Sequence, residues 1–194
     1  AAGAAAPAAE EDDGRSEGRF YLGLGAGAMR LHNATHPKPG SNLRGVQPYV
    51  VLRLGYDFAD SPLSLEGFGM IGRGTKTASG AHGGRTILGL GAEALWHFDR
   101  YARFDPFLAG GLAYYGATSA PIWQDGKEAH LFAQAGLGAF WHLTERLSLR
   151  GDLRWHVALD DDFLHFTTAD LGLVWFCGGP GDDGGAAGLE PLAP

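Results

Sequence analysis

The feature that most constrains this chain is a long-range alternation between apolar residues and residues that are either polar or glycine. The alternation runs through eight segments of 10 to 15 residues, and none of them has the 3.6-residue period of a helix. Such a pattern predicts β-strands about twice as long as usual in soluble proteins. The segments are 19–31, 47–58, 63–72, 85–98, 106–116, 129–143, 147–159 and 164–176.

The connections between these segments alternate in length. Residues 32–46, 73–84 and 117–128 form long connections, whereas 59–62 and 144–146 are short. Residues 99–105 are intermediate, and 160–163 do not follow the trend. This arrangement predicts up-and-down antiparallel hairpins with tight turns at one end and extended loops at the other, an asymmetry typical of transmembrane β-barrels.

The two faces of the predicted strands differ in chemistry. In segment 147–159, Leu149, Leu153 and Trp155 alternate with Arg150 and Arg154. We expect the polar face to line the lumen of a small closed barrel, which is only wide enough for side chains. The predicted lumen charge network is Arg53, Glu66, Glu93, Arg150, Asp152, Arg154 and Asp170. Glycines on neighbouring strands are expected to leave room for it: Gly23, Gly25, Gly27, Gly89, Gly91, Gly136 and Gly138.

Aromatic residues gather where the predicted strands meet the short turns or the chain ends. Such a ring predicts an interfacial girdle at one rim of a membrane barrel. Its predicted members are Phe20, Tyr56, Phe58, Trp96, Phe98, Phe107, Trp141, Trp175 and Phe176. Tyr114, Tyr115 and Trp155 are expected at the opposite rim. A tilted strand of about 12 residues spans roughly 30 Å, which matches the hydrocarbon core of a bilayer.

Composition and the chain ends add further limits. The net charge of −7 and the lack of any Lys/Arg-rich run disfavour nucleic-acid binding. The single cysteine, Cys177, excludes an internal disulfide.

The chain is predicted to have three regions: a flexible acidic segment at 1–18, a barrel domain at 19–177 and a flexible Gly/Pro-rich tail at 178–194. The first segment looks like an N-terminus left after removal of a signal peptide.

Several segments resemble the eight-stranded outer-membrane barrels of the OmpA-type superfamily: FYLGLGAGAMRL, PYVVLRLGYDF, PFLAGGLAYYG, LSLRGDLRWHV and ADLGLVWF. The last is also similar to the terminal-strand signal read by the barrel assembly machinery, although residues 178–194 follow it here. The resemblance covers about residues 19–176 and implies an all-β transmembrane barrel in a Gram-negative outer membrane, with periplasmic termini and extracellular long loops.

The resemblance also implies partners and a role. The expected partners are outer-membrane lipids and lipopolysaccharide, the barrel assembly machinery during biogenesis, and possible envelope proteins. The expected role is structural, anchoring or interactive, without catalysis or a cofactor. The larger members of the superfamily continue into a peptidoglycan-binding domain, but we do not expect one in residues 178–194, so cell-wall tethering is not carried over.

Alternatives remain open at this stage. A narrow pore or an adhesin would use the same barrel. A lipid A deacylase would need a His-x-Ser motif on the outer wall; His165-Phe166-Thr167 approaches it, with threonine for serine and no matching glutamate. A soluble lipocalin-like barrel would have the two faces reversed, with apolar residues inside. Three features disfavour it: the strand length, the aromatic rim, and the near absence of charged residues on the apolar face, where Arg30, at a rim, is the nearest to an exception.

Two further motifs have simpler explanations. Residues 23–28 and 89–94 match the dinucleotide fingerprint G-x-G-x-x-A, but neither opens a predicted helix, as that fingerprint requires. The histidines His32, His36 and His82 have no ligand spacing around them and are expected to be solvated loop residues rather than a metal site.

Overall fold

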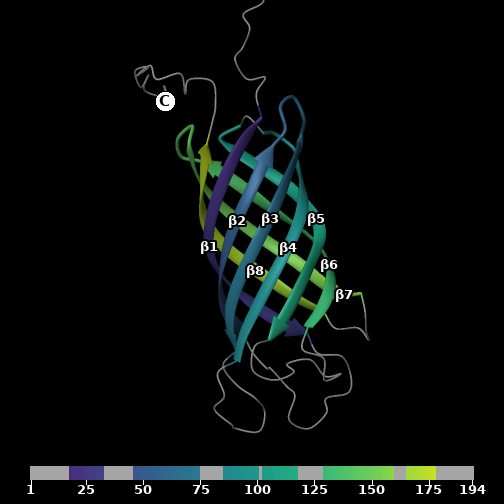
Figure 1. The fold of residues 1–194 in the computed structure, drawn as a ribbon. Helices are drawn as coiled ribbons and strands as arrows, with labels where there is room; N and C mark the ends of the chain where they lie inside the picture. Colours follow the sequence, from purple (N-terminus) through teal and green to yellow (C-terminus); the bar gives the residue numbers. More distant parts are fainter. Residues whose placement is uncertain are drawn as a thin grey trace, which may run out of the picture.

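The computed structural model describes residues 18–32, 46–74, 85–100, 102–117, 129–159 and 165–177. They form eight strands: β1 (Arg19–His32), β2 (Val46–Asp57), β3 (Leu63–Gly74), β4 (Arg85–His97), β5 (Phe104–Ala117), β6 (Ala129–His142), β7 (Leu147–Ala158) and β8 (His165–Cys177). Each strand pairs antiparallel with its neighbours in the chain, and β8 pairs back with β1 to close the barrel (Figure 1). The predicted eight-stranded antiparallel barrel is confirmed, with every strand boundary within two residues of its expected position.

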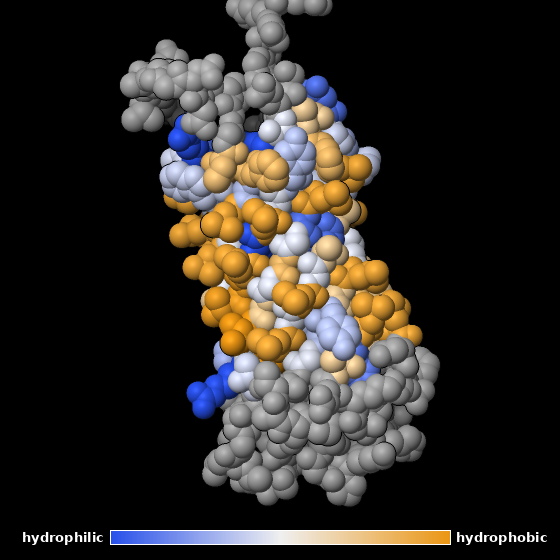
Figure 2. All heavy atoms as spheres, in the orientation of Figure 1, coloured by the Kyte–Doolittle hydropathy of each residue, from blue (hydrophilic) through white to orange (hydrophobic). Residues whose placement is uncertain are grey.

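The alternation in the sequence becomes an alternation in burial. Side chains along β2 are exposed and buried in turn over almost the whole strand. Leucines dominate the outside, with Leu90 and Leu171 exposed by 69% and 65%. Figure 2 shows hydrophobic side chains covering the middle of the visible face. The leucine-rich face of the strands therefore points outward and the charged face inward, which is the reverse of a lipocalin-like barrel. Within the described residues, no helix is long and apolar enough to cross a membrane.

The two ends of the barrel differ as the connection lengths predict. The start of β1, the end of β8 and the short connections 58–62 and 143–146 lie at one end (Figure 1). The turn at 143–146 is closed by the backbone N–H of Leu143, which donates to the carbonyl of Leu147 at 2.9 Å. Asp60, in the other turn, has a positive φ of 51°. The predicted terminal regions, apart from Gly18, lie outside the described residues.

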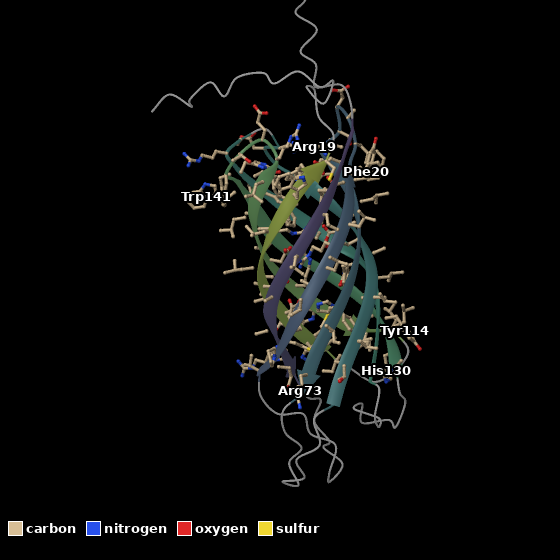
Figure 3. All side chains as sticks on the ribbon, turned by 60° about the vertical axis from the view of Figure 1, so that its left-hand side comes forward. Arg19, Phe20, Arg73, Tyr114, His130 and Trp141 are labelled. Carbon is tan, nitrogen blue, oxygen red and sulfur yellow. The ribbon has the colours of Figure 1, made fainter. Side chains whose placement is uncertain are left out.

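Most of the predicted aromatic girdle faces outward at the short-connection end. Figure 3 places Phe20 and Trp141 there, and Tyr114 at the opposite end. Outward side chains at the first rim are Phe20, Tyr56, Phe58, Trp96, Phe98, Trp141 and Trp175, together with Phe104, which the sequence analysis did not include.

Two girdle assignments are wrong. Phe107 and Phe176 lie inside the barrel, exposed by 0% and 3%. Their positions along the strands suggested a rim, but both occupy the inward parity, two residues from Ala109 and Val174. Tyr115 is buried for the same reason, so Tyr114 and Trp155 remain as the outward aromatics predicted for the far rim.

Candidate functional site

The candidate site is the filled interior of the barrel, where polar and apolar groups lie in successive layers. The layer nearest the short connections, the mouth cluster, is polar: Asp57, Ser64, His97, Arg100 and Asp105. The proximal apolar layer follows: Tyr21, Leu95, Phe107, Ala109, Phe140, Val174 and Phe176. The distal apolar layer lies toward the long connections: Met29, Tyr49, Val51, Met70, Ile87, Ala113, Tyr115, Phe132 and Phe166.

Between the apolar layers lies the ionic layer, made of the seven charged residues predicted for the lumen: Arg53, Glu66, Glu93, Arg150, Asp152, Arg154 and Asp170. All seven side chains are buried. Alternation places them inward, and three of them, from Arg150 to Arg154, follow one another along the inward face of β7. The structure therefore brings together every member of the predicted network.

Each arginine of the ionic layer meets more than one carboxylate. Nε of Arg150 lies 2.6 Å from Oδ2 of Asp152, and the same guanidinium pairs with Glu66. Nη2 of Arg154 lies 2.6 Å from Oδ1 of Asp152 and 2.8 Å from Oε1 of Glu93. The acid–base pairs, which the sequence alone left undefined, thus form one connected network.

Arg53 extends this network to the opposite wall. Its Nη2 lies 2.8 Å from Oδ1 of Asp170 and 3.5 Å from Oδ2 of Asp152, and its Nε lies 3.3 Å from Oε1 of Glu66. The guanidinium of Arg150 also lies over the rings of Phe107 and Phe140, at 5.1 Å from each centroid. The ionic layer therefore rests directly on the proximal apolar layer.

Neutral donors complete the hydrogen bonding, and the sequence analysis missed them. The ionic layer has four carboxylates and only three guanidinium groups, so the carboxylates need further donors. Tyr21 donates to Oε2 of Glu66 at 2.8 Å, Tyr49 to Oδ2 of Asp170 at 2.7 Å, and Gln134 to Oε2 of Glu93 at 3.0 Å. Their inward parity was the one signal that could have identified them.

Glycines give the ionic layer its space, with two exceptions. A methyl group added at Gly25 would lie 3.1 Å from Nη1 of Arg53, and one at Gly138 would lie 2.9 Å from Oδ1 of Asp152 and 2.5 Å from the ring of Phe107. Gly23, Gly27 and Gly136 similarly adjoin Arg53, Asp170 and Arg154. Gly89 and Gly91 instead make room for the rings of Tyr115 and Phe68, because aromatic rather than charged side chains extend toward them. The prediction was wrong for those two.

The mouth cluster contains a serine, a histidine and an aspartate in the order of a catalytic triad. Nε2 of His97 lies 2.9 Å from Oγ of Ser64, and Nδ1 of His97 lies 2.6 Å from Oδ2 of Asp105. However, Ser64 donates its proton to Oδ1 of Asp57 at 2.7 Å. Asp57 also accepts from Arg100 and Arg19, so it is held as a carboxylate that can only accept.

This hydrogen bonding removes the catalytic potential of the triad. The hydroxyl proton of Ser64 is donated to Asp57, so it is not directed at Nε2 of His97 as a serine–histidine catalytic pair requires. Ser64 has no exposed surface, so a substrate would not reach it. Arg100 closes the mouth by donating to the backbone carbonyls of Phe58 and Ser61. The cluster is therefore a polar plug.

The outer wall holds the other residues considered for chemistry. The hydroxyl of Thr167 lies 3.0 Å from Nε2 of His32, and the ring of His165 stacks on Trp155. No carboxylate occupies the outward positions around them on the described parts of β1, β7 and β8, so an acid to orient the histidine is missing there.

Neither of the other ligand-binding motifs forms a site among the described residues. Both G-x-G-x-x-A matches lie within strands, β1 and β4, rather than at the start of a helix. The described residues contain no group of His, Cys, Asp or Glu that could hold a metal ion. His36 and His82 lie outside the described residues.

The comparisons agree with this architecture. A family profile described as the outer membrane protein beta-barrel domain matches residues 1–175. The chain is similar to Neisserial surface protein A, with 15% identity and a TM-score of 0.58, covering 80% of this chain and 96% of that one. No curated protein sequence matches the chain.

Two further solved structures have a similar fold. Ail, the attachment invasion locus protein of Yersinia pestis, is 13% identical with a TM-score of 0.56, covering 83% of this chain and 99% of that one. The N-terminal β-barrel domain of OprF from Pseudomonas aeruginosa is 17% identical with a TM-score of 0.53, covering 83% and 100%. At these identities the likeness concerns the fold alone.

Proposed function

Because this chain belongs to the outer membrane protein beta-barrel domain family, and hence to the bacterial outer membrane, we propose that it is a sealed barrel with a structural or interactive role. In this proposal the barrel anchors its long connections at the cell surface and conducts no solutes. The lumen charge network acts as a plug that stabilises the barrel, and the outward aromatic residues act as the girdle that fixes it in the membrane.

The filled lumen is the observation that carries this proposal. Two apolar layers enclose the ionic layer, and Phe107, Phe132, Phe140 and Phe166 within them have 0 or 1% exposure. A cavity of about 30 Å³ lies beside Arg53, Glu93 and Tyr115, room for only about two water molecules. An ion crossing this interior would have to separate buried ion pairs, each of which costs several kcal/mol to break.

The asymmetry of the two barrel ends supports the proposed orientation in the membrane. Outer-membrane barrels have short periplasmic turns and longer extracellular loops. We therefore assign connections 33–45, 75–84, 118–128 and 160–164 to the cell surface and both termini to the periplasm. The barrel assembly machinery, outer-membrane lipids and lipopolysaccharide are the partners expected for a barrel in this orientation.

The test is single-channel recording in planar bilayers with protein extracted in mild detergent. Folding is checked on the same preparation, since a closed barrel changes its migration on SDS gels when boiled. We expect the heat-modifiable protein to give no discrete conductance steps. Reproducible steps from heat-modifiable protein would establish a pore and overturn the sealed-lumen proposal. Protein without heat-modifiability, absent from the outer-membrane fraction, would overturn the membrane barrel itself.

A further inference from the structure

An ordered group of side chains lies on the outer wall where β7, β8 and β1 reach the long connections. Pairing places Thr167 directly opposite both Trp155 and Arg30, and His165 opposite His32. Strand parity turns these side chains outward, because the intervening Met29, His156, Phe166 and Thr168 are buried in the lumen. We name the five outward residues the rim platform: Arg30, His32, Trp155, His165 and Thr167.

The rings of the rim platform are stacked against one another. The ring centroids of Trp155 and His165 are 5.1 Å apart with planes 15° from parallel, and those of His32 and His165 are 5.4 Å apart at 12°. The hydrogen bond between His32 and Thr167 ties β1 to β8 at the same level. Trp155 nevertheless keeps 48% of its surface exposed, so part of the stack is accessible to a ligand at the rim.

The exposed charged side chains that the structure describes at this end suit an anionic ligand. Among the side chains that the structure describes at the long-connection end, the exposed charged ones are Arg30 and Arg73, both positive. The exposed carboxylates of the described residues, Asp60, Asp99 and Glu145, lie in the connections at the opposite end. Arg30 stands beside the stacked rings, so a guanidinium and an aromatic face are offered together. Guanidinium recognises phosphate, and an aromatic face can pack against the apolar face of a sugar ring.

The wall beneath the rim platform suits a hydrocarbon chain. The next outward row holds Ala28, Ala169 and Leu153, and the row after it holds Ala26, Leu171 and Gly151. Alanine and glycine project less than leucine, so an acyl chain can lie against this wall between Leu153 and Leu171, which are exposed by 49% and 65%. A ligand with a headgroup at the rim and a tail along the wall would contact both features.

We propose that the rim platform binds a membrane lipid whose headgroup carries phosphate on a sugar ring. Arg30 binds the phosphate, the exposed face of Trp155 packs on the sugar, and the alanine rows receive an acyl chain. This inference rests on the proposed membrane orientation, because it requires the long-connection end to lie in the leaflet that contains such a lipid. The binding itself is a property of the folded barrel and can be measured apart from that orientation.

The test measures lipid binding by native mass spectrometry of the folded barrel in a non-ionic detergent. Three lipids are compared: bisphosphorylated lipid A, the same lipid with its phosphates removed, and phosphatidylglycerol, which has a phosphate but no sugar. Arg30→Gln is matched by Arg73→Gln, the other arginine that the structure describes as exposed at this end. Trp155→Leu is matched by Trp96→Leu, an exposed tryptophan at the opposite rim. Heat-modifiability confirms that each variant is folded.

We expect the wild type to prefer lipid A to both other lipids. Arg30→Gln should weaken lipid A binding about tenfold, because a charge-assisted hydrogen bond to phosphate contributes roughly that factor, and should not affect the phosphate-free lipid. Trp155→Leu should weaken binding of both sugar lipids and not of phosphatidylglycerol. The matched control variants should bind like the wild type.

Three results would overturn the inference. An equal loss of lipid A affinity in Arg73→Gln or Trp96→Leu would indicate that lipids are attracted to the barrel rims in general rather than to the rim platform. Equal affinity for phosphatidylglycerol would remove the sugar from the recognition. Displacement by soluble glucosamine phosphate at the same concentration as lipid A would show that the tail contributes nothing. A folded, non-conducting barrel without selective lipid binding would overturn this inference and leave the sealed-lumen proposal intact. A conducting barrel that binds lipid A selectively would overturn the sealed-lumen proposal and leave this inference intact.

Discussion

Asp152 is the residue on which the ionic layer converges. Its carboxylate lies 2.6 Å from Arg150, 2.6 Å from Arg154 and 3.5 Å from Arg53. The Asp152→Asn substitution keeps the shape but leaves three buried guanidinium groups short of an acceptor. We expect a loss of about 3–5 kcal/mol in the free energy of unfolding, the usual cost of removing one partner from a buried pair. Urea unfolding of the barrel in detergent micelles measures it.

Two matched variants separate this effect from simple loss of a negative charge. Asp170→Asn removes a carboxylate that meets only Arg53 among the arginines, so it should destabilise less than Asp152→Asn. Glu145→Gln alters an exposed carboxylate in the β6–β7 turn and should change stability by less than about 0.5 kcal/mol. Equal losses for all three variants would mean that net charge, rather than the contacts of Asp152, sets the stability.

At the scale of single residues, the sequence predicted correctly which charged side chains face the lumen, but it did not predict the direction of every aromatic side chain. A charged residue in the middle of a membrane strand has one acceptable direction, inward, so alternation sufficed for Arg53 or Asp170. An aromatic residue at a strand end is acceptable on either face. Phe107 faces inward because its partner across the β5–β6 pairing is Gly138, which leaves its ring room. That pairing depends on a register which the sequence does not reveal.

At the scale of a strand, the same substitution should have opposite effects on the two faces of the sheet. Gly136 of β6 faces the lumen, and a methyl group there would overlap the backbone carbonyl of Leu153 and approach Cδ of Arg154 to 2.7 Å. Gly67 of β3 is exposed on the outer wall, where the nearest atom to an added methyl group is 3.9 Å away. Gly136→Ala should therefore cost about 1–3 kcal/mol by overpacking.

Gly67→Ala should be neutral or stabilising by up to about 1 kcal/mol, because alanine loses less backbone entropy than glycine on folding. Urea unfolding of both variants, alongside the wild type in the same micelles, measures the two changes. If both substitutions destabilise equally, glycine in this sheet is required for the backbone rather than for space in the lumen. The interpretation of the inward glycines would then be wrong.

Strand positions were predictable because long alternation and turn residues fix them, whereas register was not. Glycine-rich strands specify their pairing weakly, since few side chains distinguish one register from the next. In the folded barrel, ion pairs across the lumen make that distinction: Arg53 of β2 meets Asp170 of β8, and Arg150 of β7 meets Glu66 of β3. These strands are not all neighbours, so the contacts become apparent only when the barrel is closed.

At the scale of the whole molecule, the asymmetry of the barrel predicts which end faces outward. The strand ends that the long connections join lie at one end of the barrel, whereas β1 begins and β8 ends at the other (Figure 1). The chain has a single cysteine, Cys177, so a Cys177→Ser background allows clean labelling of introduced thiols. Two single-cysteine variants on this background are informative: Ser79→Cys in connection 75–84 and Glu145→Cys in the β6–β7 turn.

Intact cells treated with a membrane-impermeant maleimide should label the Ser79→Cys variant and not the Glu145→Cys variant. Permeabilising the outer membrane should make both thiols reactive, because the turn at 143–146 is exposed at the barrel end assigned to the periplasm. The opposite pattern would invert the barrel in the membrane and place the rim platform in the inner leaflet. Since the rim platform requires a phosphorylated sugar lipid around it, that result would also remove the setting in which its binding has a role.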